Sequence, residues 1–174
     1  FWNLPHLYNE ILKGLKKVAS QGVSIDSIGI DTWGCDFAFF GEDGQLLGLP
    51  YCYRDPHTDG AQEKFFSRMP SEELYRRTGI QFMNFNSVFQ MDTLLRSGCT
   101  AIKDASKILF IPDALAYMLT GEAVCEYTVA TTSQMLNAAS GELDSEILKT
   151  LGLERSRFGR MVRPGEQIGV LNEQ

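Results

Sequence analysis

The sequence has little positive charge and no long hydrophobic run. Lysine and arginine total 16 against 22 aspartate and glutamate residues, which gives a formal net charge of −6 over 174 residues. A surface that follows a nucleic-acid backbone needs clustered basic residues, so we expect no nucleic-acid partner. No apolar stretch approaches the roughly 20 residues that span a bilayer, and the N-terminus carries no signal-peptide pattern. These absences favour a cytoplasmic protein that acts on a small molecule.

Cysteine is scarce and scattered. The four cysteines, Cys35, Cys52, Cys99 and Cys125, lack the closely spaced pairs of a zinc site. A chain of this length with 44% apolar residues can bury a substantial core without disulfide bonds. We therefore expect reduced thiols and no metal site.

Hydrophobic periodicity predicts a mixed α/β fold. Helical spacing of apolar residues predicts helices at residues 4–18, 60–69, 71–79, 86–98, 112–121 and 145–153. Short apolar runs predict strands at residues 24–31, 35–40, 45–53 and 106–111, and a further strand begins within 163–171. We expect the first three strands to form a meander, with a turn at residues 41–44. Ser71 is expected to cap the helix that it begins.

A polar cluster interrupts the apolar pattern at residues 31–36, which read Asp-Thr-Trp-Gly-Cys-Asp. Gly34 lets a ligand approach main-chain N–H and C=O groups, because no Cβ stands in the way. Trp33 offers a flat apolar face of the kind on which sugar rings lie. The cluster therefore predicts an edge that binds a polyol. A β-bulge with a core tryptophan explains the same residues, and spacing does not choose between the two.

Two further segments place aromatic and polar side chains after apolar runs. Tyr53 can supply a second aromatic wall and Arg54 a charged donor, with Asp55 as an acceptor for hydroxyls. An ion pair between Arg54 and Asp55 is the structural alternative. Phe85 faces either a ligand or the core. His57 is expected to be a surface turn residue, because it has no carboxylate partner nearby in the chain.

Small polar residues follow in two places. Asn86 or Ser87 is expected to cap the helix at 86–98. The threonine-rich segment 126–135 either offers hydroxyls to a ligand or supports neighbouring loops, and we favour the supporting role.

Four segments, taken in order, resemble one known family. They read GIDTWGCDFAFFGEDGQLLGLPYCYRD, TGIQFMNFNSVFQM, IPDALAYMLTGEAVCEYTVATTSQMLN and FGRMVRPGEQIG. In this order they resemble the N-terminal domain of the FGGY family of carbohydrate kinases over nearly the whole chain. Within the family, DTWG followed by YRD favours the members that phosphorylate L-rhamnulose over glycerol and xylulose kinases.

The resemblance implies an actin-like, ribonuclease H-like fold in which two domains close around a cleft. Sugar would bind to the N-terminal domain, and ATP with Mg²⁺ mainly to the C-terminal one. Residues 1–174 would then be a single partial N-terminal domain. The family's first phosphate hairpin is expected before Phe1, and its aspartate general base and adenosine pocket beyond Gln174. We therefore expect no catalytic residue within the segment and no activity from the segment alone.

The resemblance also assigns substrate-binding positions. Gly34 matches the position whose main chain contacts the ketose, and Trp33 and Cys35 flank it. The remaining expected ligand-facing residues are the aromatic side chains of Tyr53 and Phe85 and the polar side chains of Asp31, Asp36 and Arg54. Two alternatives stay open: a kinase of the same family for another sugar, such as xylulose, fuculose or glycerol, and a non-catalytic actin-like module that binds sugar or a protein.

Overall fold

The computed structural model describes residues 1–172 and confirms the mixed α/β class. In this part of the chain the α-helices are α1 (Leu4–Ser20), α2 (Ala61–Phe66), α3 (Ser71–Thr78), α4 (Ser87–Arg96), α5 (Thr100–Asp104), α6 (Ile111–Thr120), α7 (Tyr127–Thr131) and α8 (Ser145–Leu151). The strands are β1 (Phe37–Phe40), β2 (Lys107–Phe110), β3 (Val124–Glu126) and β4 (Arg160–Val162), and the short 3₁₀ helices are η1 (Pro56–Thr58) and η2 (Arg155–Phe158).

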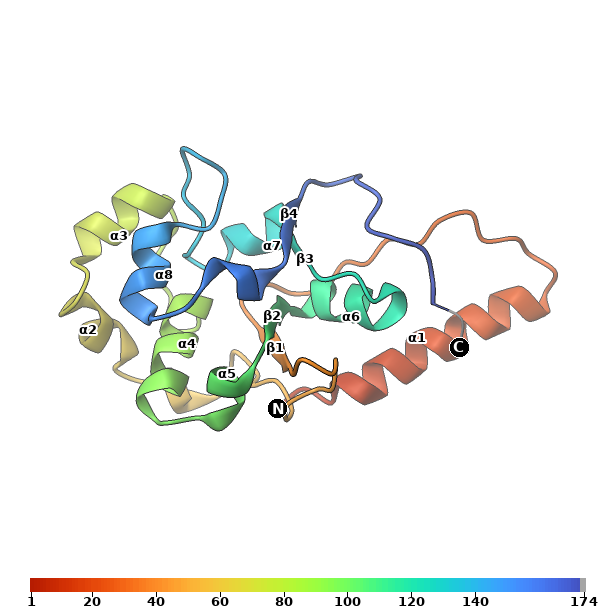
Figure 1. Cartoon of the computed structure of the whole chain (residues 1–174), viewed down its shortest axis with the longest axis horizontal. Coiled ribbons are helices and arrows are strands. Elements are labelled where there is room, and N and C mark those ends of the chain that lie inside the picture. The colour runs from red at the N-terminus through yellow and green to blue at the C-terminus, as the bar shows by residue number, and fades with distance from the viewer. Residues whose placement is uncertain (173–174) are drawn as a thin grey trace.

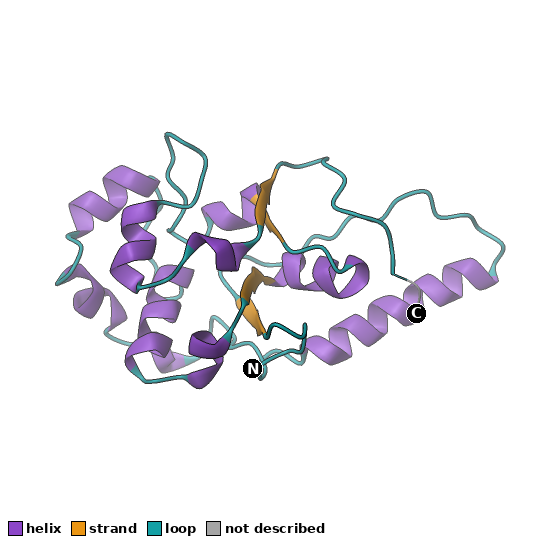
Figure 2. Cartoon of the chain, viewed as in Figure 1, coloured by secondary structure: helices purple, strands orange, loops and turns teal. Residues whose placement is uncertain are grey.

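The strands form two small sheets. β1 and β2 pair antiparallel with Phe37 opposite Phe110, whereas β3 and β4 pair parallel with Val124 opposite Arg160. Figure 1 shows both pairs near the middle of the molecule, with α2, α3, α4 and α8 gathered at one end and α1 at the other. Coloured by secondary structure, the same view shows how much of the chain at the α1 end is loop (Figure 2).

The β1–β2 pair separates two hydrophobic clusters. Phe37 and Phe39 face a large cluster that also contains buried residues of α2, α3, α4, α5 and α8. Ala38 and Phe40 face a smaller cluster with Leu4 of α1 and the buried face of α6. Successive side chains of a strand point to opposite faces, so a strand buried on both faces reads as a continuous apolar run. This explains the uninterrupted Phe-Ala-Phe-Phe of β1.

The predicted meander is wrong. Residues 24–31 are not a strand, and Ile25 and Ile28 are 41% and 37% exposed. Within the described residues, no hydrogen bond involves the main chain of residues 23–31. A strand needs a neighbour that pairs its N–H and C=O groups, and no strand in the described part of the chain lies beside this segment. β1 instead pairs with β2, which comes much later in the sequence.

The predicted strand at 45–53 is also wrong beyond its first residues. Leu46 forms an isolated bridge with Phe40, and the Leu47 N–H donates to the Phe39 carbonyl oxygen at 2.8 Å. The backbone then takes a positive φ of 80° at Gly48, and Pro50 has no N–H to donate, so the ladder ends. The strand expected within 163–171 is likewise irregular.

The predicted helices are confirmed, with shifted ends. The helix at 60–69 is shorter, spanning only α2, and Pro70 rather than Ser71 occupies the N-cap position of α3. α3 ends as predicted at Gly79, which has a φ of 67°. α5, α7, β3 and β4 were not expected from the sequence. Among the described residues, no helix is both long enough and apolar enough to cross a membrane.

Candidate functional site

A tight turn at residues 34–36 leads the chain into β1. The Asp36 N–H donates to the Gly34 carbonyl oxygen at 2.9 Å, and Cys35 between them has a φ of 70°. This is the geometry of a classic γ-turn, which is rare and strained for a residue with a side chain. Cys35 is buried, and burial raises the pKa of its thiol to about 11. Its side chain is therefore an inert part of the turn.

Asp36 is fully buried and is surrounded by donors. Its Oδ2 accepts hydrogen bonds from the indole N–H of Trp2 at 2.6 Å and of Trp33 at 3.0 Å. The same oxygen accepts from the main-chain N–H of Tyr53 at 3.1 Å, and Oδ1 accepts from the Gln90 side chain at 3.0 Å. The lone pairs of this carboxylate thus accept hydrogen bonds from the protein itself. Asp36 contributes to the candidate site by holding Trp33 and Tyr53 in place.

Aromatic side chains cover this carboxylate. The rings of Trp2 and Trp33 lie 4.2 Å apart between centroids, and the Tyr53 ring meets Phe85 edge-on at 5.5 Å. The exposed Arg54 donates from Nε to the Tyr53 hydroxyl at 2.9 Å. Arg54 therefore contacts Tyr53, not Asp55, and the ion pair considered as an alternative does not form among the described residues.

His57 differs from its prediction as a surface turn residue. It lies in η1, its side chain is only 12% exposed, and its ring stacks on Tyr51 with 4.5 Å between centroids. Its main-chain N–H donates to Oδ1 of Asp55 at 2.9 Å, which caps the short helix. The ring Nδ1 lies 3.2 Å from the same oxygen, so the expectation that His57 has no carboxylate nearby in the chain was wrong. The histidine is thus a packing element beside the aromatic group.

Gly34 packs against Thr132, a contact that the sequence did not predict. A Cβ at position 34 would lie 2.6 Å from Oγ1 of Thr132 and 2.8 Å from its Cβ and Cγ2. Real Cβ atoms do not approach other heavy atoms this closely, so any side chain here would force the two segments apart. Close packing therefore already requires a glycine at position 34, independently of any ligand.

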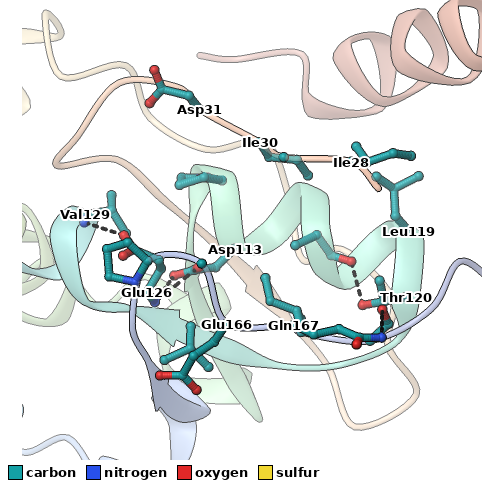
Figure 3. A pocket seen from close by; sticks show the side chains of 18 of the residues that line it. Ile28, Ile30, Asp31, Asp113, Leu119, Thr120, Glu126, Val129, Glu166 and Gln167 are labelled. Atoms are coloured by element: carbon teal, nitrogen blue, oxygen red, sulfur yellow. Dashed lines mark hydrogen bonds between the residues drawn. The ribbon is translucent and has the colours of Figure 1, made fainter. Parts of the chain in front are cut away.

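An open groove of about 1010 Å³ lies beside the turn. Its walls are residues 25–34 and 162–171, and its floor comes from α6, β3 and α7. Asp31, Trp33 and Gly34 line it, and Figure 3 shows the carboxylate of Asp31 pointing away from the floor residues.

The groove floor carries two neighbouring carboxylates. The buried Asp113 accepts the main-chain N–H of Glu126 at 3.1 and 3.2 Å (Figure 3). Burial, with a smaller contribution from the charge of Glu126, raises the pKa of Asp113 to about 7. Glu126 in turn accepts the N–H of Val129 at 2.9 Å and so caps α7. The described residues contain no group of three or more histidine, cysteine, aspartate or glutamate side chains that could hold a metal ion.

The predicted site residues therefore fall into two adjoining groups. Asp31, Trp33 and Gly34 line the groove, whereas Tyr53, Arg54 and Phe85 form the aromatic group that does not line it. Cys35 and Asp36 are buried between the two groups, and Asp36 joins them through its bonds to Trp33 and Tyr53.

Sequence reasoning missed three contributors to the site: Trp2, Gln90 and Thr132. A glutamine among the apolar residues of α4 was a readable signal for a buried polar contact. The contact between Thr132 and residue 35 spans 97 positions and leaves no local pattern.

Two residues that line the groove have main-chain N–H groups without a partner among the described residues. No acceptor within residues 1–172 binds the N–H of Trp33 or of Gly34. Both residues line the groove, next to the indole ring of Trp33. Free N–H groups beside an aromatic face suit a ligand with hydroxyl groups and an apolar side.

Comparison with known families and proteins gives a consistent result. The model of the FGGY family of carbohydrate kinases, N-terminal domain, matches residues 1–174. A rhamnulokinase of Bacteroides thetaiotaomicron is 57% identical over 174 residues, which is 100% of this chain and 36% of that protein. A rhamnulokinase of Mannheimia succiniciproducens is 41% identical over 169 residues, 97% of this chain and 35% of that protein. The chain thus spans about a third of the length of the curated relatives it matches.

Solved structures share the fold at low sequence identity. Glycerol kinase from Plasmodium falciparum with ADP superposes with a TM-score of 0.83 at 18% identity, over 97% of this chain and 35% of that one. Ligand-bound xylulose kinase from Lactobacillus acidophilus gives 0.82 at 19% identity, over 94% and 34%. These similarities confirm the expected fold of a partial N-terminal domain of an actin-like sugar kinase.

Proposed function

Because the chain belongs to the FGGY family of carbohydrate kinases, we propose that it is the sugar-binding part of an ATP-dependent kinase that converts L-rhamnulose to L-rhamnulose 1-phosphate. The observation that carries this choice of sugar is the identity of 57%, 41% and 42% to three rhamnulokinases. The solved kinases of xylulose, gluconate and glycerol share the fold at only 11–20% identity. The reaction belongs to rhamnose breakdown, for which we propose a cytoplasmic location.

The edge formed by Trp33 and Gly34 is where we propose that the ketose binds. The N–H groups of both residues are free to donate to sugar hydroxyls, and the Trp33 ring supplies the apolar face. Asp36 fixes the orientation of that ring through the indole N–H. Asp31 is exposed at the same edge and can accept from a further hydroxyl.

Tyr53, Arg54 and Phe85 are proposed to complete the sugar site from the aromatic group. Asp36 accepts hydrogen bonds from both Tyr53 and Trp33 and so links the two walls. Cys35 contributes through its backbone, because its buried thiol is not accessible to a ligand.

Mg²⁺ does not fit the residues described. Phosphoryl transfer needs metal and donor groups that neutralise the developing charge, and residues 1–172 contain no cluster of metal-binding side chains. Asp113 and Glu126 are only two carboxylates, and both oxygens of Asp113 already accept the main-chain N–H of Glu126. We therefore propose that the nucleotide, the metal and the aspartate general base belong to other parts of the full-length protein, and that residues 1–174 alone show no kinase activity.

A substrate panel with the complete gene product tests this proposal. ADP release is measured with L-rhamnulose, L-rhamnose, xylulose, fuculose and glycerol as acceptors. We expect kcat/KM for L-rhamnulose to exceed that of every other acceptor by about tenfold or more, since sites built to bind hydroxyls reject analogues that lack or misplace them. Preference for another acceptor would overturn the assigned sugar, and absence of sugar-dependent ADP release would favour a binding module. Residues 1–174 serve as the control and should remain at background.

A further inference from the structure

The γ-turn at residues 34–36 is strained, yet it is buried in the middle of the candidate site. Its central residue, Cys35, has a φ of 70° and is only 8% exposed. Such conformations are unfavourable and persist only when the surrounding structure holds them in place. The groups that hold this turn therefore determine where Trp33 and Asp36, its two neighbours in the site, are placed.

Thr132 makes the contact with the turn from the end of α7. Its Oγ1 accepts the N–H of Cys35 at 2.9 Å, and its carbonyl oxygen accepts the thiol of Cys35 at 3.4 Å. Its side chain also fills the space against Gly34, where a Cβ would lie 2.6 Å from Oγ1. One threonine thus supplies both a hydrogen bond and close packing to the turn.

The donor of the Thr132 hydroxyl is used within the protein. It donates its single proton to the carbonyl oxygen of Val129 at 2.8 Å, and its oxygen accepts the N–H of Cys35 at 2.9 Å. Thr132 is therefore suited to hold the turn and not to donate to a ligand.

Neighbouring groups anchor the threonine itself. The side-chain amide of Asn86 donates to the Thr132 carbonyl oxygen at 3.3 Å, and the N–H of Val88 donates to the Ser133 carbonyl oxygen at 3.0 Å. Ser87, on the same turn of α4, donates from its hydroxyl to the carbonyl oxygen of Cys35 at 2.5 Å. The start of α4 therefore clamps both the turn and Thr132.

We propose that Thr132 is a positioning residue of the sugar site: its hydroxyl holds the 34–36 turn in the conformation that presents the Trp33 and Gly34 edge to the ketose. This inference rests on the proposed function and deepens it. Loss of the hydroxyl leaves the N–H of Cys35 without an acceptor, so the turn relaxes from its strained conformation. A relaxed turn displaces the edge that binds sugar and leaves distant parts of the protein unaffected.

Replacement of Thr132 in the complete gene product tests the role, because the effect on KM for the sugar can be measured separately from the effect on KM for ATP. Thr132→Val keeps the shape and removes the hydroxyl, Thr132→Ser keeps the hydroxyl, and Thr131→Val is the matched control, because the Thr131 hydroxyl bonds only within α7. We expect Thr132→Val to raise KM for L-rhamnulose about 10- to 100-fold, the scale of a small misplacement of binding groups. KM for ATP should stay unchanged, and Thr132→Ser and Thr131→Val should resemble the unmodified enzyme.

Alkylation of Cys35 reports on the turn without any substrate. N-ethylmaleimide labelling followed by peptide mass spectrometry should show slow modification of Cys35 in the unmodified protein, because the thiol is buried and its pKa is raised to about 11. Thr132→Val should increase the labelling rate of Cys35 severalfold relative to Cys52, and Thr132→Ser should restore it.

The outcomes separate the two proposals. An unmodified enzyme that does not phosphorylate L-rhamnulose would overturn the proposed function. An active Thr132→Val enzyme with an unchanged KM for L-rhamnulose would overturn the positioning role and leave the function standing. Unchanged labelling of Cys35 in Thr132→Val would also overturn that role, because the turn would then be held without the hydroxyl.

Discussion

Asp36 and Gly34 show how the same residue types serve packing and binding at once. The sequence predicts both as ligand contacts. In the structure, Asp36 accepts four hydrogen bonds from other groups of the protein. The structure also places Gly34 against Thr132. The candidate edge could be located from the sequence because Trp33 and Gly34 interrupt an apolar pattern locally. The residues that hold this edge in place could not be predicted from the sequence. Thr132 and Gln90 are 97 and 54 positions away from the residues they contact.

A cycle of substitutions separates the two reasons for a glycine at position 34. Gly34→Ala should lower the thermal midpoint of the complete gene product, because the new Cβ would meet three atoms of the Thr132 side chain. Thr132→Gly removes those three atoms, so the double variant should recover the midpoint of Thr132→Gly alone. Calorimetry then compares the affinity of the double variant for L-rhamnulose with that of Thr132→Gly. Weaker binding by the double variant than by Thr132→Gly supports backbone contact with sugar at Gly34, and equal binding would contradict it.

Asp113 should make stability depend on pH. Burial raises its pKa to about 7 in the folded state, above its value of 3.8 as a free group. The folded protein therefore binds more protons than the unfolded chain between about pH 4 and pH 7, and stability from this group is lost as the pH rises through that window. Asp113→Asn should reduce the fall in thermal midpoint between pH 5 and pH 8. An identical fall in both proteins would show that Asp113 does not titrate in this range.

At the scale of elements, helices were predictable and strand pairing was not. Helical periodicity and terminal glycines are local signals, and they placed α1, α3, α4, α6 and α8 within a few residues. A strand is specified by a partner that can come from anywhere in the chain. β1 was located correctly by its apolar run, but its pairing with β2 has no counterpart in the local sequence. Residues 24–31 have the pattern of a strand and no partner among the described residues.

Hydrogen exchange should distinguish residues 23–31 from the paired strands β1 and β2. The amides of residues 23–31 form no hydrogen bond with residues 1–172, and in the isolated 174-residue chain they should exchange without protection. The amides that pair β1 with β2 should be protected in the same sample and serve as the internal control. In the complete gene product we expect residues 24–31 to gain protection by joining a sheet. Fast exchange there in both proteins would argue against a strand at this position.

At the scale of the whole molecule, apolar side chains remain exposed at the α1 end. Val23, Ile25 and Ile28 are 54%, 41% and 37% exposed, and Val170 and Leu171 are 74% and 50% exposed. Figure 1 shows the loop that follows α1 and the C-terminal segment at this end of the molecule. Exposed apolar residues on a segment with unpaired main-chain groups favour association with a further chain.

The isolated 174-residue chain should therefore self-associate. Sedimentation velocity should show a concentration-dependent shift to larger species, and Ile28→Asp combined with Val170→Asp should reduce it. Tyr75→Asp, which changes an exposed aromatic residue of α3 at the opposite end, is the control and should leave association unchanged. A monomer that unfolds at the same temperature as the complete gene product would contradict the expectation.

A crystal structure of the complete gene product with L-rhamnulose tests the central claim most directly. The account predicts a ketose beside residues 31–34, with hydroxyl groups about 3 Å from the main-chain nitrogen of Trp33 or Gly34. One face of the sugar should lie on the Trp33 ring, and Thr132 should hold the 34–36 turn without touching the ligand. A ketose bound elsewhere, with the Trp33 and Gly34 edge free of ligand, would contradict the account.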